Sequence, residues 1–133
     1  MYFYFMQHTF QKTERLCSRT EIGKLFDEGE SVKAFPMKMV WRRTSHTQEY
    51  PIQVMFSVSK RNFKSAVTRN RIKRQLREVY RVKKHEWYAE LEGDACAIAI
   101  IYTGRKKVSS EELADRIKKL FNRFFDDYKK VSD

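Results

Sequence analysis

The 133-residue chain has few of the residues on which disulfide frameworks and metal sites depend. Its two cysteines, Cys17 and Cys96, match no metal or redox spacing and fit a reducing cytosol better than a disulfide framework. We expect both thiols to be buried. The three histidines, His8, His46 and His85, are too scattered to form a ligand set. The sequence therefore predicts no metal site in the protein.

Long apolar runs are also missing. No stretch approaches the roughly 20 apolar residues of a membrane span. The apolar opening "MYFYFM" lacks the basic region and the cleavage pattern of a signal peptide. We therefore expect a cytoplasmic protein with no membrane partner. Met6 offers an alternative start, with residues 1–5 as an upstream extension.

What the chain does contain is ordinary material for one folded domain. It is 41% hydrophobic and 34% charged, with both signs present, which argues against a disordered chain. Its length allows a core without disulfides or metals. We expect one α+β domain over residues 1–133, in which residues 1–17 form an extended N-terminal segment.

Three segments have helical patterns. Residues 18–29 begin with a Ser18–Glu21 capping pair and end at Gly29. Residues 67–88 contain no glycine or proline. A last helix follows "SSEE", and its apolar residues recur at helical spacing: Leu113, Ile117, Leu120, Phe121, Phe124 and Tyr128.

Strand patterns fill the remaining segments. Residues 31–42 alternate around a break at Pro36, and residues 52–58 alternate most clearly. A polar connection joins these two segments, so we expect them to form an antiparallel pair. The run "ACAIAIIYT" is almost entirely apolar, which is typical of a central strand covered on both faces.

The segment from Lys60 to Lys84 carries almost the whole net charge. It has eleven basic residues and one acid, Glu78, which gives a local charge of +10 in a chain of formal charge +11. On a helix, the apolar residues from Ile72 to Tyr80 share a face that would pack on the sheet. Beside that face we expect an exposed basic stripe, formed by Arg69, Lys73, Arg77, Arg81 and Lys84.

A polyanion is the partner that this charge predicts. An ordinary solvated helix face mixes charges of both signs, and one glutamate cannot offset eleven bases. No helix-turn-helix, zinc-finger or zipper context favours DNA, and the apolar helix face is needed by the sheet rather than by a membrane. Single-stranded RNA fits best, with Phe26, Phe35 and Trp41 as candidate stacking rings; core packing is the alternative for each ring.

The stretch "SVSKR…AVTRNRIKRQLREVYR" resembles the protein subunit of bacterial ribonuclease P, which carries an Arg-Asn-Arg helix after a "SVSK" strand end. "FQKTERL", "TEIGKLFDEG" and "SSEELADRIKKLF" resemble its N-terminal segment, first helix and last helix. The resemblance implies an αβββαβα sandwich with a mixed sheet and a left-handed βαβ crossover. A right-handed crossover is the general rule, so the hand comes from the family alone.

The resemblance also implies which residues bind RNA. Ile22, Phe26 and Ser57 fall on positions that line a cleft for the leader of precursor tRNA, although both helix positions are usually phenylalanine in the family. The residues that fall on the basic helix and on the loop before it are Lys60, Arg61, Lys64, Arg69, Asn70, Arg71, Lys73, Arg74, Arg77 and Arg81.

The expected partners are the ribonuclease P RNA and the 5′ leader of precursor tRNA, with no small-molecule substrate. The resemblance places the catalyst and most of the Mg²⁺ in the RNA, so no residue here is expected to be catalytic. Two alternatives stay open. One is a general RNA-binding or ribosome-associated module with a similar βαβ core. The other is a protein-only RNA-processing enzyme, which the scattered acids disfavour.

Overall fold

The computed structural model describes residues 14–44, 51–91 and 94–132. His8, His46, the alternative start at Met6 and most of the N-terminal segment lie outside these residues. Within them the elements are, in order, α1 (Arg19–Glu28), β1 (Glu30–Ala34), β2 (Met37–Arg43), β3 (Ile52–Val58), α2 (Ala66–Glu90), β4 (Cys96–Tyr102) and α3 (Ser110–Ser132). This is the predicted αβββαβα order.

The four strands form one mixed sheet with the order β1-β2-β4-β3. β4 pairs antiparallel with β2 and parallel with β3, so α2 connects two adjacent parallel strands. The predicted antiparallel pairing of β2 with β3 is therefore wrong. β4 lies between them because its almost fully buried side chains gain most from a central position.

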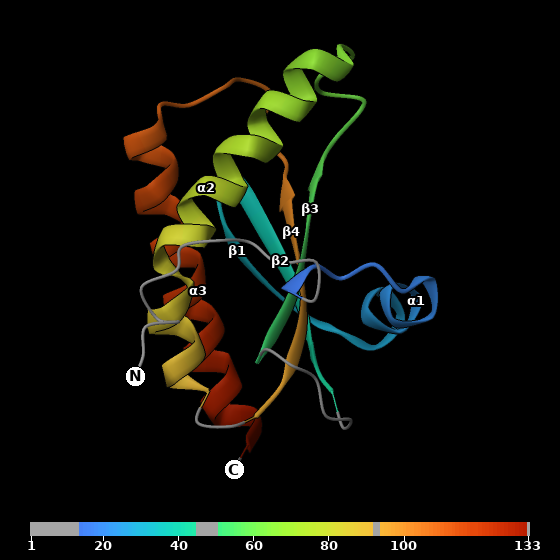
Figure 1. Ribbon diagram of the computed structural model, residues 1–133, viewed down its shortest axis with the longest axis vertical. Helices are drawn as coiled ribbons and strands as arrows, with labels where there is room; N and C mark the ends of the chain where they lie inside the picture. The colour runs from blue at the N-terminus through green and yellow to red at the C-terminus, as the bar shows by residue number, and fades with distance from the viewer. Residues whose placement is uncertain (1–13, 45–50, 92–93, 133) are drawn as a thin grey trace.

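Helices cover both faces of the sheet, α2 and α3 on one face and α1 on the other (Figure 1). The face under α2 and α3 holds the larger core, where Trp87 and Phe121 stack with ring centroids 3.7 Å apart. Trp41 meets Phe124 edge to face at 5.2 Å. The six apolar positions predicted for the last helix are all buried in this core.

The opposite face of the sheet holds a smaller core beneath α1. Leu25 of α1 is fully buried against Val40, Ala97 and Ala99, and Ile22 packs at the margin of the same cluster. Ser18 accepts the capping hydrogen bond from the Glu21 amide, and Gly29 follows the last helical residue, as predicted. α1 is ten residues long and leaves part of this sheet face uncovered.

The start of the described chain is fastened to β3 and α2. The Leu16 amide donates to the Val54 carbonyl (2.9 Å), and Arg15 forms a parallel bridge with Val54. Glu14 is fully buried, and its two carboxylate oxygens lie 2.8 and 2.6 Å from Nζ of Lys84. The Tyr88 hydroxyl donates to the same carboxylate. This segment therefore covers the outer edge of β3 at Val54.

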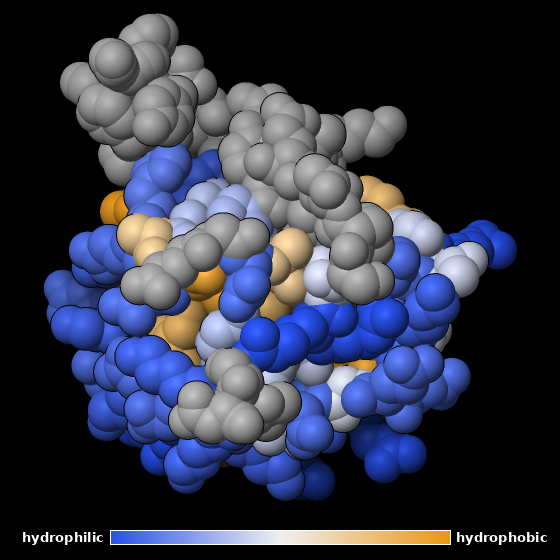
Figure 2. All heavy atoms as spheres, turned by 90° about the horizontal axis from the view of Figure 1, so that it is seen from below, coloured by the Kyte–Doolittle hydropathy of each residue, from blue (hydrophilic) through white to orange (hydrophobic). Residues whose placement is uncertain are grey.

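The two ends of the molecule differ in what they present. In Figure 1 the first turns of α2 stand beyond the end of the sheet, near the loop that leaves β4. Figure 2 shows the other end, where the visible described residues are mostly hydrophilic and the hydrophobic ones form small patches. In the described ranges, none of the helices has both the length and the apolar character that crossing a bilayer requires.

Candidate nucleic-acid interface

The first half of α2 presents an exposed cationic surface. Ser65 caps the helix by accepting from the Thr68 amide (3.3 Å), and Ile72, Leu76 and Tyr80 anchor the opposite side in the core. These anchors fix which residues face the solvent. The members of the predicted set with exposed side chains are Lys60, Arg61, Lys64, Asn70, Arg71, Arg74 and Arg77.

The exposed face includes a shallow hollow lined by Val67, Asn70, Arg71 and Arg74. Val67 is 69% exposed, which is unusual for a valine, so the hollow has an apolar side chain beside its two arginines. In the described parts of the chain, no ion pair joins Arg71, Arg74 or Arg77 to an acid. These charges remain available to an external anion.

Other members of the predicted set have partners inside the protein. The Arg69 guanidinium donates to the carbonyls of Phe63 (2.8 Å) and Lys64 (2.9 Å), so it braces the loop before α2. Arg81 pairs with Glu78, and the hydrogen bond from Arg81 lowers the pKa of that exposed carboxyl. Lys73 is half-buried.

Lys84 is a correction to the predicted stripe. It is 2% exposed and pairs with Glu14, so it faces the core and not a ligand. Its position could have been read from α2 itself, because Lys84 continues the buried series Ile72, Leu76 and Tyr80 at intervals of four residues. No comparable sequence pattern predicts the burial of its partner, Glu14.

The loop from Ser59 to Ser65 is held against the loop that leaves β4. Nδ2 of Asn62 lies 3.0 Å from the Thr103 carbonyl and 3.3 Å from the Gly104 carbonyl. Lys60 and Arg61 therefore project from an ordered loop at the end of the sheet where β3 and β4 both finish. Sequence reasoning missed Asn62 because its partners lie about 40 residues away.

The three residues predicted for a leader cleft lie on the α1 side of the sheet. Ser57 points to the same face as Met55, since side chains alternate along a strand. Ile22, Met55 and Ile101 are all partly buried around the smaller core. Phe26 is 48% exposed on α1. The structure brings these side chains to one face but contains no ligand that tests the prediction.

Of the other predictions for aromatic residues and cysteines, some are confirmed and others are wrong. Phe35 is 64% exposed, whereas Trp41 is buried between Phe124 and Tyr128 and is not available for stacking on RNA. Cys17 is exposed, so its predicted burial is wrong: it directly follows the buried Leu16 on a segment with one inward face. Cys96 is buried, and burial raises the pKa of its thiol to about 12.

Acidic and metal-binding side chains do not converge in the described residues. No group of three or more His, Cys, Asp or Glu side chains there is placed to hold a metal ion. His85 makes an edge contact with Tyr88. The candidate site is therefore a surface of cations and exposed apolar side chains, suited to binding.

Comparisons with known proteins agree on one family. A family model described as Ribonuclease P matches residues 10–124. The chain is 35% identical over 117 residues to the ribonuclease P protein component of Chlorobium phaeobacteroides, covering 80% of each chain. It is 42% identical over 74 residues to that of Porphyromonas gingivalis, where the match spans 56% of this chain and about half, 54%, of the relative.

Solved structures show the same fold. The RNase P protein of Staphylococcus aureus superposes with a TM-score of 0.67 at 21% identity, covering 82% of this chain and 93% of that one. The protein from Thermotoga maritima gives a TM-score of 0.66 at 21% identity, covering 82% and 96%. With the sequence match over most of its length, the chain belongs to the ribonuclease P protein family.

Proposed function

We propose that this protein is the RNA-binding subunit of a cytoplasmic ribonuclease P, in which a catalytic RNA removes the 5′ leader from precursor tRNA. The observation that carries the proposal is the exposed face of α2, where Arg71, Arg74 and Arg77 have no acidic partner in the described residues. Crowded like charges disfavour the free state, and RNA phosphates would neutralise them with release of counterions.

The protein's contribution to catalysis is electrostatic and positional. A compact RNA brings many phosphates together, and a cationic protein face lowers the Mg²⁺ concentration needed to hold them. In this proposal the metal ions that act on the scissile phosphate are held mainly by RNA. We assign no catalytic residue to the protein.

The leader is proposed to lie on the α1 side of the sheet. Met55 and Ile101 leave partly exposed apolar surface there, and the exposed ring of Phe26 stands on the adjacent helix. An unpaired strand has base faces that stack on rings and apolar side chains. Ser57 lies two residues before Ser59 and the basic loop, so one strand can reach from this face to Lys60 and Arg61.

The test is cleavage of a 5′-leader precursor tRNA at low Mg²⁺ by the protein alone, by a compatible ribonuclease P RNA alone, and by both together. We expect cleavage at the mature 5′ end by the mixture and not by the protein. No gain over RNA alone would favour a general RNA-binding module. Cleavage by the protein alone would favour a protein-only enzyme.

A single variant separates leader contact from general RNA binding. In the assembled enzyme, Phe26→Ala should weaken binding of leader-bearing precursor about tenfold, because a stacking contact is lost, while mature tRNA binding stays the same. Equal losses for the two RNAs would show that Phe26 acts only in packing α1.

A further inference from the structure

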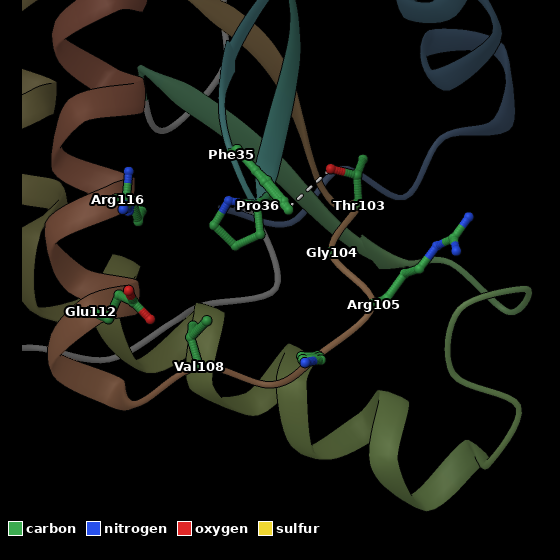
Figure 3. Close-up of a pocket in the computed structure, with 9 residues that line it drawn as sticks. Phe35, Pro36, Thr103, Gly104, Arg105, Val108, Glu112 and Arg116 are labelled. Atoms are coloured by element: carbon green, nitrogen blue, oxygen red, sulfur yellow. Dashed lines mark hydrogen bonds between the residues drawn. The ribbon is translucent and has the colours of Figure 1, made fainter.

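A pocket of about 530 Å³ lies at the end of the sheet, between the turn that joins β1 to β2, the loop after β4 and the first turns of α3. Figure 3 shows Glu112 and Arg116 projecting from α3 on one side, with Phe35, Pro36 and Thr103 across from them and Val108 between. Gly104, Arg105 and Lys106 complete the lining. None of these residues belongs to the predicted RNA-binding or leader-binding set, apart from Phe35 as a candidate ring.

The walls of the pocket are fixed by hydrogen bonds. Thr103 donates to the Pro36 carbonyl through both its amide (2.7 Å) and its hydroxyl (3.1 Å). The Tyr102 hydroxyl donates to the Lys106 carbonyl at 2.5 Å, and burial raises the pKa of that hydroxyl. A Cβ on Gly104 would lie 2.8 Å from Cβ of Pro36, so a glycine is needed for the two segments to pack this closely.

The pocket combines an exposed aromatic ring with several basic side chains. Phe35 is 64% exposed, although the turn that carries it is held by the two hydrogen bonds from Thr103 to the Pro36 carbonyl. The pocket has three basic side chains, Arg105, Lys106 and Arg116, against one acid, Glu112. In the chain as described, no ion pair involves any of the three bases. Arg105 points away from α3 in Figure 3, so it lies at the rim.

The pocket lies next to the basic loop of the candidate RNA interface. Asn62, in the loop that carries Lys60 and Arg61, donates to the carbonyls of Thr103 and Gly104 in the pocket wall. An RNA strand on the basic loop therefore needs to cross only the β4–α3 loop to reach Phe35.

We infer that this pocket binds one unpaired nucleotide of an RNA strand, with its base on the Phe35 ring and a neighbouring phosphate against Arg116 and Lys106. Glu112 provides an acceptor for base N–H groups. A ring, nearby cations and a rigid wall are the combination that single-strand binding sites use. The inference rests on the proposed function for the choice of RNA as the occupant, and it adds a contact surface separate from α2.

The test compares two ligands by fluorescence anisotropy with the full chain: a short labelled oligouridylate and an abasic ribose-phosphate oligomer of the same length. Phe35→Ala should weaken oligouridylate binding about tenfold and leave binding of the abasic oligomer within about twofold, because only the base stacks. Arg116→Gln should weaken both ligands by similar factors, since it contacts phosphate.

Lys118→Gln is the matched control for Arg116→Gln. It removes one positive charge from the same helix, on an exposed side chain about 160° away around the axis. We expect a smaller loss than for Arg116→Gln with both ligands. Equal losses for these two variants would show a general charge effect and would overturn the phosphate contact.

Three further outcomes are decisive. If Phe35→Ala leaves oligouridylate binding unchanged while Arg74→Ala weakens it, the pocket is not an RNA site and the proposed α2 interface stands. If the pocket variants behave as expected but the mixture with ribonuclease P RNA fails to cleave precursor tRNA, the inference stands and the proposed function fails. If Phe35→Ala alters sedimentation of the protein instead of RNA affinity, the occupant is a second copy and the inference is wrong.

Discussion

Lys84 and Glu14 lie 70 positions apart in the sequence and form an ion pair with side-chain exposures of 3% and 0%. Taking both charges out of water is costly, so the pair adds little net stability over an apolar pair of similar volume. The pair instead determines position, because the Lys84 ammonium and the Tyr88 hydroxyl both bind the Glu14 carboxylate. The pair therefore fixes where the N-terminal segment crosses α2.

Removing one partner of this pair should be far more harmful than removing both. Lys84→Met leaves the Glu14 carboxylate buried without its cation, and we expect the free energy of unfolding to fall by about 3–5 kcal/mol in urea titrations. The double variant Glu14→Leu/Lys84→Met should recover most of that loss. A change below about 1 kcal/mol for Lys84→Met would contradict the buried position of the ion pair.

α2 combines two functions along one helix. Its inner face, with Ile72, Leu76 and Tyr80, completes the core, while Arg71 and Arg74 stay exposed on the outer face. Arg69 lies between these faces, and its guanidinium donates hydrogen bonds to two carbonyls of the loop before α2. Two arginines five positions apart on one helix are therefore expected to act differently.

The difference between Arg74 and Arg69 can be measured in the assembly with ribonuclease P RNA. Arg74→Ala should reduce the slope of log affinity against log salt concentration by about one, with no change in the fold, because it removes one phosphate contact. Arg69→Ala should instead speed amide hydrogen exchange in residues 60–65, since the two hydrogen bonds from the guanidinium to the loop carbonyls are lost. An unchanged salt slope for Arg74→Ala would place that side chain away from the RNA.

Sequence patterns predicted the elements well because helix and strand periodicity is a local property. The capping of α1, the break at Pro36 and the buried face of α3 all follow from neighbours within a few residues. The position of β4 between β2 and β3 depends on long-range pairing, which no local pattern encodes. The contact of Asn62 with the β4–α3 loop and the burial of Lys84 escaped prediction for the same reason.

Buried thiol and phenol groups make the stability of the whole molecule depend on pH. Cys96 in the sheet, Tyr80 and Tyr88 on α2, and Tyr128 on α3 all have a raised pKa, with burial as the main cause. In the unfolded chain these groups lose their protons first, near pH 8.5 for a thiol and near pH 10 for a phenol. The unfolded state then binds fewer protons than the folded state, so raising the pH favours unfolding.

We therefore expect the free energy of unfolding to fall as the pH rises above about 9, measured by urea denaturation across the alkaline range. Around pH 9 the buried thiol is the largest single contributor, at about 1 kcal/mol per pH unit, and the buried phenols add to the loss as the pH approaches 10. Cys96→Ala should flatten this part of the profile, whatever its effect on packing at neutral pH. The same slope in Cys96→Ala and in the parent protein would show that other groups cause the loss.

The N-terminal segment that Glu14 fastens has a further consequence for the molecule as a whole. A strand at the edge of a sheet is a template on which another chain can add, and the usual result is aggregation. Arg15 and Leu16 occupy that position along β3. At the opposite edge, β1 is five residues long and carries Glu30 and Lys33, while Arg123 donates to the Lys33 carbonyl. The same few contacts that position the segment thus limit association of the protein with itself through the β3 edge of its sheet.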